Sequence, residues 1–154
     1  MNILALDLGS RTGWAVYTPG MSLSGFVDFK NSRHEGGGMR YLRFRHWLNE
    51  QQRALQEVNA VYYEEVRRHA GTDAAHVYGG LLGILTAWCE QHRIPYRGIP
   101  VGTIKKHATG KGNADKAAMV AAAQKLMGRV VTDDNEADAL CILHFALQTE
   151  GVNA

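Results

Sequence analysis

The sequence predicts an α/β fold in which a mixed β-sheet begins with three antiparallel strands and carries helices on both faces. Three observations support this fold class. Three short strand-like segments come first, and tight turns separate them. Helical and strand-like segments then alternate, with short connections between them. A chain of 154 residues can bury one ordinary core, so we expect a single domain over 1–154.

The leading strands come from the first part of the chain. Residues 2–8 form an apolar run that one acid interrupts, and WAVYT (14–18) follows after a glycine turn. LSGFVDF (23–29) alternates apolar and polar residues, as a half-buried strand does. The three segments together predict an antiparallel meander, and NSRHEGGG (31–38) is then expected to form a loop.

Helices and strands alternate in the middle of the chain. Apolar residues recur at helical spacing over 39–58, which predicts a helix. NAVYYEEV (59–66) is expected to be a strand that ends in acids, and a second helix is expected over 74–92. IPYRGI (94–99) is predicted to form a short strand.

Two helices are predicted to close the chain. Asn113 is a candidate cap for a helix over 114–127, and Gly128 is placed to end it. The last helix is expected over 135–147. The predicted order of elements is therefore β-β-β-α-β-α-β-α-α.

The composition indicates a soluble globular protein whose charges are unevenly spread. Hydrophobic residues make up 45%, charged residues 21%, and the net charge is +2. Basic residues crowd into 33–46, 66–69 and 103–116, while acids gather in 132–138. This pattern suits a polyanion held against metal-binding carboxylates, although a mixed solvated surface would account for the composition alone. Cys89 and Cys141 lie in apolar helical patterns and are expected to be reduced core thiols.

The sequence contains neither a signal peptide nor an apolar run long enough to span a bilayer. We therefore expect a cytoplasmic protein that does not associate with membranes.

Five acids stand out because of their places in the predicted elements. Asp7 interrupts the first apolar strand, although burying an unpaired charge is costly. Glu64 and Glu65 lie near the end of the fourth strand. Asp134 and Asp138 lie at the start of the last helix, one turn apart on the same side. The sequence thus raises the question of what pairs with Asp7.

A divalent cation is one answer. Neighbouring carboxylates repel each other unless a cation lies between them, and Mg²⁺ prefers oxygen ligands. Two such ions about 4 Å apart could position a water and stabilise the leaving oxygen in phosphodiester cleavage. Three of the five acids also have a simpler explanation. Asp7 could accept hydrogen bonds from the following turn, and Asp134 and Asp138 could simply favour the positive end of a helix dipole.

Three segments resemble motifs of the RuvC-type Holliday junction resolvases. LALDLGSRTGWAV is similar to the first-strand motif of that family, VYYEEVRRHAGTDAAHVYGGLLGIL to its second motif, and NEADALCILHFAL to its closing helix. The resemblance covers most of the chain in the right order. It implies a ribonuclease H-like fold and metal-dependent cleavage of branched DNA, such as four-way junctions, to 5′-phosphate and 3′-hydroxyl ends. Symmetric cutting implies a homodimer, for which the helices over 39–58 and 74–92 are the expected interface.

The resemblance also implies a metal-binding and catalytic set. Asp7 matches the first-strand Asp, and Asp138 matches the last Asp of the closing helix. Glu64 matches the Glu of the second motif. Glu65 is its neighbour, but strand alternation sends the two to opposite faces, so only one can share a site with Asp7. The ligands imply Mg²⁺, as two ions, with Mn²⁺ as an alternative.

The fourth ligand departs from the family pattern. Bacterial resolvases usually place an acid or His three residues before the last Asp, where this chain has Asn135. Asp134 can reach the same side and resembles the arrangement in mitochondrial resolvases, so we predict Asp134 as the fourth catalytic ligand. Asn135 stays open as the alternative, through its side-chain carbonyl. The small size is compatible with a phage or prophage protein.

Basic residues complete the implied site. The resemblance implies that lysines between the last strand and the final helices contact phosphates near the cut, which here are Lys105 or Lys106, Lys111 and Lys116. A lysine such as Lys116 could also stabilise charge that develops on the scissile group. Arg11 and the basic segment 33–45, with its three glycines, could contact DNA as well. A solvated loop would explain the lysines equally, and TGKGNADK does not have P-loop spacing.

Three other classes of protein remain open at the sequence level. An actin-like or sugar-kinase-like ATPase also begins with a D-x-G strand, but it needs two large lobes that 154 residues do not hold. A ribonuclease H-like nuclease that acts on structured RNA is the second alternative. The third is a junction-binding module without catalytic activity.

Overall fold

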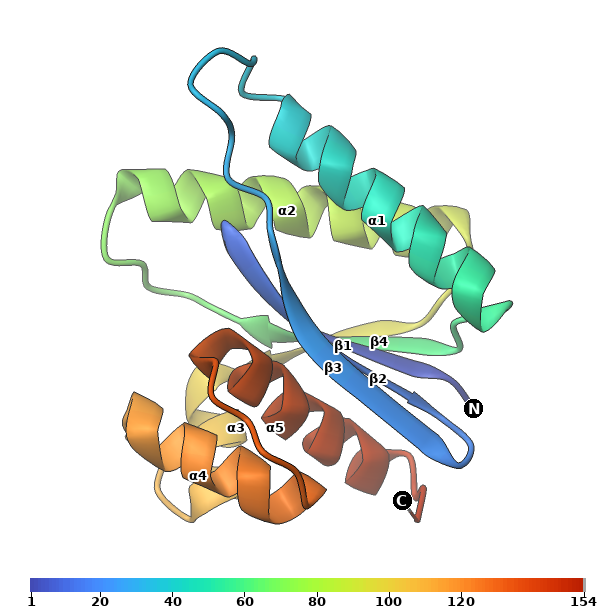
Figure 1. The fold of residues 1–154 in the computed structure, drawn as a ribbon, viewed down its shortest axis with the longest axis vertical. Helices are drawn as coiled ribbons and strands as arrows, with labels where there is room; N and C mark the ends of the chain where they lie inside the picture. Colours follow the sequence, from blue (N-terminus) through green and yellow to red (C-terminus); the bar gives the residue numbers. More distant parts are fainter. Residues whose placement is uncertain (154) are drawn as a thin grey trace.

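The computed structural model describes residues 1–153 and contains, within them, one five-stranded mixed sheet between two helical layers (Figure 1). The strand order is β3-β2-β1-β4-β5; β1, β2 and β3 pair antiparallel, and β4 and β5 run parallel to β1. The strands are β1 Ile3–Asp7, β2 Arg11–Thr18, β3 Met21–Asp28, β4 Ala60–Glu65 and β5 Tyr96–Pro100. The predicted fold class, with its three leading antiparallel strands, is confirmed.

Helices cover both faces of this sheet. The helices α1 (Met39–Leu55) and α2 (Thr72–Gln91) pack on one face, and α3 (Val101–Thr109), α4 (Lys116–Met127) and α5 (Asp134–Thr149) pack on the other (Figure 1). The apolar run of β1 follows from this burial on both sides. Ile3 and Ala5 lie in the core that α5 helps to form, and Leu4 and Leu6 lie in the core beneath α1 and α2.

Helix α3 corrects the predicted element order, which went directly from the last strand to the helix over 114–127. The structure forms α3 because Ile104 is buried in the core and because Gly110, at φ +85°, ends the helix in a left-handed conformation. Helical spacing of Ile104 and Ala108, followed by Gly110, was the available signal. It is short, and the basic residues around it suggested a loop.

The cap predicted for the next helix was wrong. Helix α4 begins at Lys116 rather than at 114, and its cap is Asp115, whose side chain accepts a hydrogen bond of 2.8 Å from the backbone N–H of Ala118. Asn113 lies two residues before that cap. Gly128 ends the helix at φ +62°, as predicted.

Two further expectations concern thiols and membranes. Cys89 and Cys141 are free and buried, in agreement with their prediction as core thiols. Within the described residues, no helix combines the length and the apolar character that crossing a bilayer requires.

Helix α5 lies unusually close to β2, and Gly13 makes this approach possible. A Cβ atom on Gly13 would overlap the backbone carbonyl of Asn135, in the first turn of α5. Polar contacts flank this point: Arg11 forms an ion pair of 2.8 Å with Asp133, and the Ser24 hydroxyl donates a hydrogen bond of 2.6 Å to Glu136. Because Gly13 is paired with Asp7 across β1 and β2, the same contact also fixes α5 relative to Asp7.

We expect Gly13→Ala to destabilise the protein by about 1–3 kcal/mol or more, since an added methyl group forces backbone apart in a packed interior. Urea unfolding followed by circular dichroism measures this loss. Gly36→Ala is the matched control because a Cβ at Gly36 meets no atom within 4 Å, and we expect it to change stability by less than about 0.5 kcal/mol. Equal stability of both variants would contradict the close approach.

Candidate metal centre

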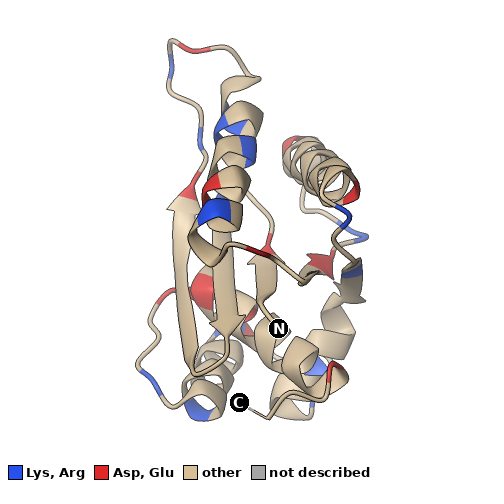
Figure 2. Ribbon diagram, turned by 90° about the vertical axis from the view of Figure 1, so that its right-hand side faces the viewer, with Lys and Arg blue, Asp and Glu red and all other residues tan. Residues whose placement is uncertain are grey.

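Three carboxylates converge at one end of the sheet. Asp7 is the last residue of β1, Glu64 lies near the end of β4, and Asp138 lies in the second turn of α5. Because β1 and β4 are parallel and adjacent, their carboxyl ends meet at the same edge. Oxygen atoms of the three side chains lie within 4.8 Å of one another, and the three residues are partly buried. Figure 2 shows acidic residues at the ends of β1 and β4 and at the start of α5.

Strand alternation decides which glutamate joins this group. Tyr62 belongs to the core beneath α5, so Glu64, two residues later, faces the same side as Asp7 and Asp138. Glu65 faces the other way and forms an exposed ion pair of 3.3 Å with Arg67. The structure therefore groups Glu64, and not Glu65, with Asp7.

Burial raises the pKa of all three carboxyl groups, and neighbouring acids add to the effect on Asp7 and Asp138. The pKa of Asp7 is raised well above its ordinary value, first by burial and then by the charges of Glu64 and Asp138. Burial, again followed by neighbouring acids, raises the pKa of Asp138 to about 7. Burial also raises the pKa of Glu64, against the opposing effect of Lys105. Three such groups form a site that a cation would stabilise.

The donor set fits a divalent cation. All the side chains offer oxygen, which Mg²⁺, Mn²⁺ and Ca²⁺ prefer, and each is reachable from solvent. Among residues 1–153, no other group of three His, Cys, Asp or Glu side chains comes together in this way. The acidic triad of Asp7, Glu64 and Asp138 is hereafter called the carboxylate triad.

Asp134 lies beside the triad but outside that 4.8 Å group. Its carboxylate forms an ion pair of 3.4 Å with Lys116, whose side chain is 87% exposed. The charge of Asp134 nevertheless acts on the triad, since it raises the pKa of both Asp7 and Asp138. Its role as a fourth ligand stays a prediction. The backbone of Asn135, the alternative ligand, is packed against Gly13.

Helix α3 separates the two adjacent lysines of the basic segment. The positive charge of Lys105 lowers the pKa of Glu64 and Asp138, so this side chain lies on the triad side of α3. Lys106, one residue on, is exposed, as is Lys111, just past the end of α3. Lys116 acts on Asp138 from the start of α4. The triad is therefore bordered by Lys105 and Lys116.

Arg11 is engaged by the protein itself. Its guanidinium pairs with Asp133 and lies 3.7 Å from the ring centre of Phe26, while its side chain stays 48% exposed. Asp133 also caps α5 by accepting a hydrogen bond of 2.9 Å from the backbone N–H of Glu136. Sequence analysis missed this cap, although Asp133 followed three residues later by Glu136 has the spacing of a capping box.

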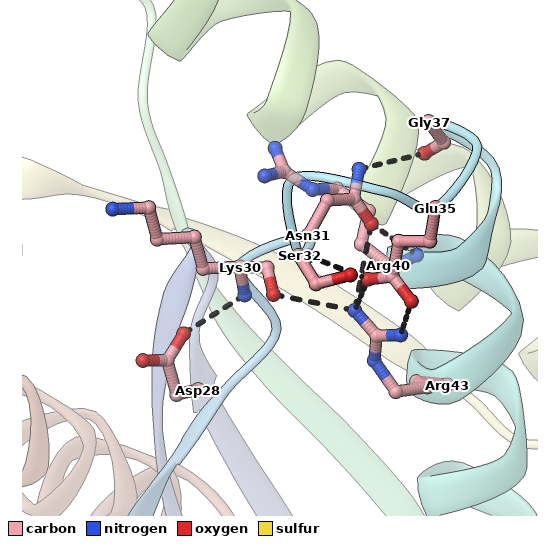
Figure 3. A network of polar contacts seen from close by, with 8 residues as sticks. All are labelled: Asp28, Lys30, Asn31, Ser32, Glu35, Gly37, Arg40 and Arg43. Atoms are coloured by element: carbon pink, nitrogen blue, oxygen red, sulfur yellow. Dashed lines mark hydrogen bonds and ion pairs between the residues drawn. The ribbon is translucent and has the colours of Figure 1, made fainter.

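The basic loop after β3 is held against α1 by its own polar contacts (Figure 3). Both guanidinium NH₂ groups of Arg43 bond to Glu35, at 2.9 and 2.7 Å. Asn31 accepts a hydrogen bond of 3.0 Å from the backbone N–H of Arg40 in the first turn of α1. Arg43 is therefore committed to an internal ion pair, which weakens the case for it among the predicted DNA contacts of this segment.

Comparisons with known proteins identify the fold. No protein-family model matches the sequence, and no curated protein is similar to it in sequence. Among solved structures, Thermus thermophilus RuvC in complex with a Holliday junction substrate superimposes with a TM-score of 0.80 at 21% identity, over 98% of this chain and 96% of that chain. A second T. thermophilus RuvC structure gives 0.75 at 22% identity, over 99% and 98%. The yeast mitochondrial Holliday junction resolvase Ydc2 gives 0.60 at 13% identity, over 92% and 75%.

The chain therefore has the ribonuclease H-like fold in the form found in RuvC. The expectation of this fold class is confirmed, and the likeness extends over nearly the full length of the RuvC chains.

The raised pKa of Asp138 predicts how pH acts on stability in a chelator. Between the ordinary pKa of 3.8 and the raised pKa of about 7 the folded protein binds more protons at this group than the unfolded chain, so stability falls as pH rises through this range. Asp138→Asn removes this effect. We expect the variant to gain stability relative to wild type by up to about 1.4 kcal/mol per pH unit over this range.

Urea unfolding in EDTA, repeated across the pH range, measures this difference. Asp28→Asn is the matched control because it makes the same chemical change at an exposed position on β3. A difference between Asp138→Asn and wild type that does not change with pH would contradict the raised pKa.

Proposed function

We propose that this chain is a divalent-metal-dependent, structure-selective endodeoxyribonuclease that resolves four-way DNA junctions. The observation that carries the proposal is the carboxylate triad, which β1, β4 and α5 bring together within 4.8 Å on a RuvC-like fold. The resemblance of the same three segments to resolvase motifs supports it independently of the geometry. The neighbouring structures named above are Holliday junction resolvases, one of them bound to a junction.

Asp7, Glu64 and Asp138 would hold the cation, with Asp134 as an outer fourth ligand. The proposed ions are two Mg²⁺, with Mn²⁺ as the alternative. When bound, such ions supply Lewis-acid activation of water and stabilise the leaving oxygen, which gives 5′-phosphate and 3′-hydroxyl ends. The raised pKa values of Asp7 and Asp138 mean that the triad releases protons when a cation binds, so affinity should increase with pH.

Lysines beside the triad would receive the DNA backbone. The charges of Lys105 and Lys116 lower the pKa of Asp138, and this nearness supports a role for both in contacting a phosphate at the triad. In this proposal Lys116 exchanges its contact with Asp134 for the scissile phosphate. Lys106, Lys111 and the exposed side of Arg11 would contact phosphates farther along the strands, so binding should weaken with salt.

Symmetric resolution of a junction needs two active sites, so we propose a homodimer. The glycines of α2 provide the basis for an interface on this helix. The space beside Gly80 is already occupied, since a Cβ there would overlap the ring of Tyr41 on α1. A Cβ on Gly79 or Gly83 would meet no atom within 4 Å, and both glycines are exposed, so this side of α2 is free to pack against a second copy.

Cleavage of a synthetic mobile four-way junction tests the proposed function. With Mg²⁺, we expect paired, symmetric nicks in the junction and none in a matched linear duplex, because two sites act on one substrate. Chelator should abolish cleavage. Asp7→Asn should reduce the rate by at least about 100-fold, since even the partners of metal ligands contribute 10- to 100-fold. Products resolved on denaturing gels give both the rate and the symmetry.

Asp28→Asn makes the same chemical change at an exposed position on β3 and should cut as wild type does. Unpaired nicks would contradict the homodimer. Binding of the junction without cleavage would point to a binding module, and preferential cleavage of structured RNA would point to a ribonuclease of the same fold.

A further inference from the structure

The side chain of Tyr78, on α2, forms hydrogen bonds with the backbone at both ends of the Glu64–Val66 segment. Its hydroxyl donates a hydrogen bond of 2.8 Å to the carbonyl of Glu64 and accepts one of 3.1 Å from the N–H of Val66. The side chain is buried, with 7% exposed, and its ring lies 5.0 Å from that of His69 in the following loop. One phenol therefore ties α2 to the end of β4 at the residue that contributes to the triad.

The sheet leaves these backbone groups without a strand partner. Strand β1 pairs with β4 only as far as the Leu6–Tyr63 pair, and the chain then turns away toward β2. In a parallel sheet, alternate residues direct their backbone groups to opposite neighbours. The N–H of Val61 bonds to Pro95, on the β5 side, so the carbonyl of Glu64 and the N–H of Val66 point to the β1 side, beyond its end.

The phenol of Tyr78 takes the place of the missing strand. It offers a donor to the free carbonyl and an acceptor to the free N–H, which would otherwise stay unpaired in a partly buried place. Packing alone would need only a phenylalanine here. The hydroxyl adds two bonds, one to the peptide unit between Glu64 and Glu65 and one to the peptide unit between Glu65 and Val66.

We propose that Tyr78 is a positioning residue of the metal centre, whose hydroxyl holds the end of β4 so that the Glu64 carboxylate faces Asp7 and Asp138. Its effect on cleavage rests on the proposed function, whereas its effect on metal binding does not. Tyr78 touches neither the ion nor DNA. Its contribution passes through the backbone of Glu64.

Binding of Mn²⁺ to the protein without DNA is the primary test. Titration followed by electron paramagnetic resonance should show about a tenfold loss of affinity for Tyr78→Phe, the lower end of what partners of metal ligands contribute. Tyr62→Phe is the matched control. Tyr62 is also a buried tyrosine of this sheet, but its hydroxyl bonds at 2.6 Å to Glu150, beyond the far end of α5. We expect its Mn²⁺ affinity to stay within twofold of wild type.

Two outcomes would overturn the inference. Melting of Tyr78→Phe in EDTA at a lower temperature, with unchanged Mn²⁺ affinity, would leave the hydroxyl a purely structural role. Equal losses of affinity in Tyr78→Phe and Tyr62→Phe would show that any lost tyrosine hydroxyl has the same effect.

Junction cleavage by the same variants separates this inference from the proposed function. At sub-saturating Mg²⁺, Tyr78→Phe should lower kcat about tenfold and leave KM for the junction unchanged, and higher Mg²⁺ should restore part of the rate. If the wild-type protein binds Mn²⁺ but cleaves no junction, the proposed function is wrong, and the ratio of Mn²⁺ affinities of wild type and Tyr78→Phe still tests the role of Tyr78. If wild type is active and Tyr78→Phe binds Mn²⁺ and cleaves as well as wild type, only the inference about Tyr78 is wrong. If wild type binds no Mn²⁺, both are wrong.

If Tyr78→Phe does not fold, a fluorine-labelled tyrosine at the same position tests the inference instead. With 3-fluorotyrosine at position 78, Mg²⁺ should shift the fluorine resonance more than it does for the same label at position 62. Equal shifts at the two positions would overturn the inference.

Discussion

Three partly buried carboxylates meet at one end of the sheet, and the site exists only while the elements that carry them are held in place. Burial raises the pKa of Asp7, Glu64 and Asp138, and the charges of neighbouring acids raise the pKa of Asp7 and Asp138 further. The three side chains stay together because each is attached to an element that other contacts hold in place. A cation bound between them would balance their negative charges.

Each element is held by a different device. Strands β1 and β4 are adjacent and parallel, which brings Asp7 and Glu64 to one edge, and Tyr78 completes the end of β4. Helix α5 needs further contacts because it packs on the face of the sheet and is not part of its hydrogen-bond ladder. Gly13 allows its first turn to touch β2, and the ion pair of Arg11 with Asp133 holds the same turn. Contacts between residues far apart in sequence thus fix the position of Asp138 on α5 relative to Asp7 and Glu64 on the sheet.

The sequence was most informative where local pattern and tertiary role coincide. An apolar run that ends in an acid, and a strand whose alternation separates Glu64 from Glu65, carry their spatial consequence in the residue order. For this reason the leading meander and the mixed-sheet fold class could be predicted from pattern, whereas the grouping of Asp7, Glu64 and Asp138 was expected from the resemblance to the resolvase motifs.

The remaining features depend on packing between distant segments. Helix α3 is short and basic, and it depends on the burial of Ile104 in the core and on the end at Gly110. The pairing of Asp134 with Lys116 depends on how α4 is placed against α5. Tyr78 acts on a strand whose neighbour stops early, and no local pattern records where a neighbouring strand stops.

Diffraction from crystals soaked in Mn²⁺ is the measurement to make first, because the anomalous signal of manganese locates the ion without reference to activity. We expect a peak within coordination distance of oxygen atoms from Asp7, Glu64 and Asp138, and its loss in Asp7→Asn crystals. A peak only at other residues, or the same peak in Asp7→Asn crystals, would contradict the claim that this corner of the sheet is built to hold a divalent cation.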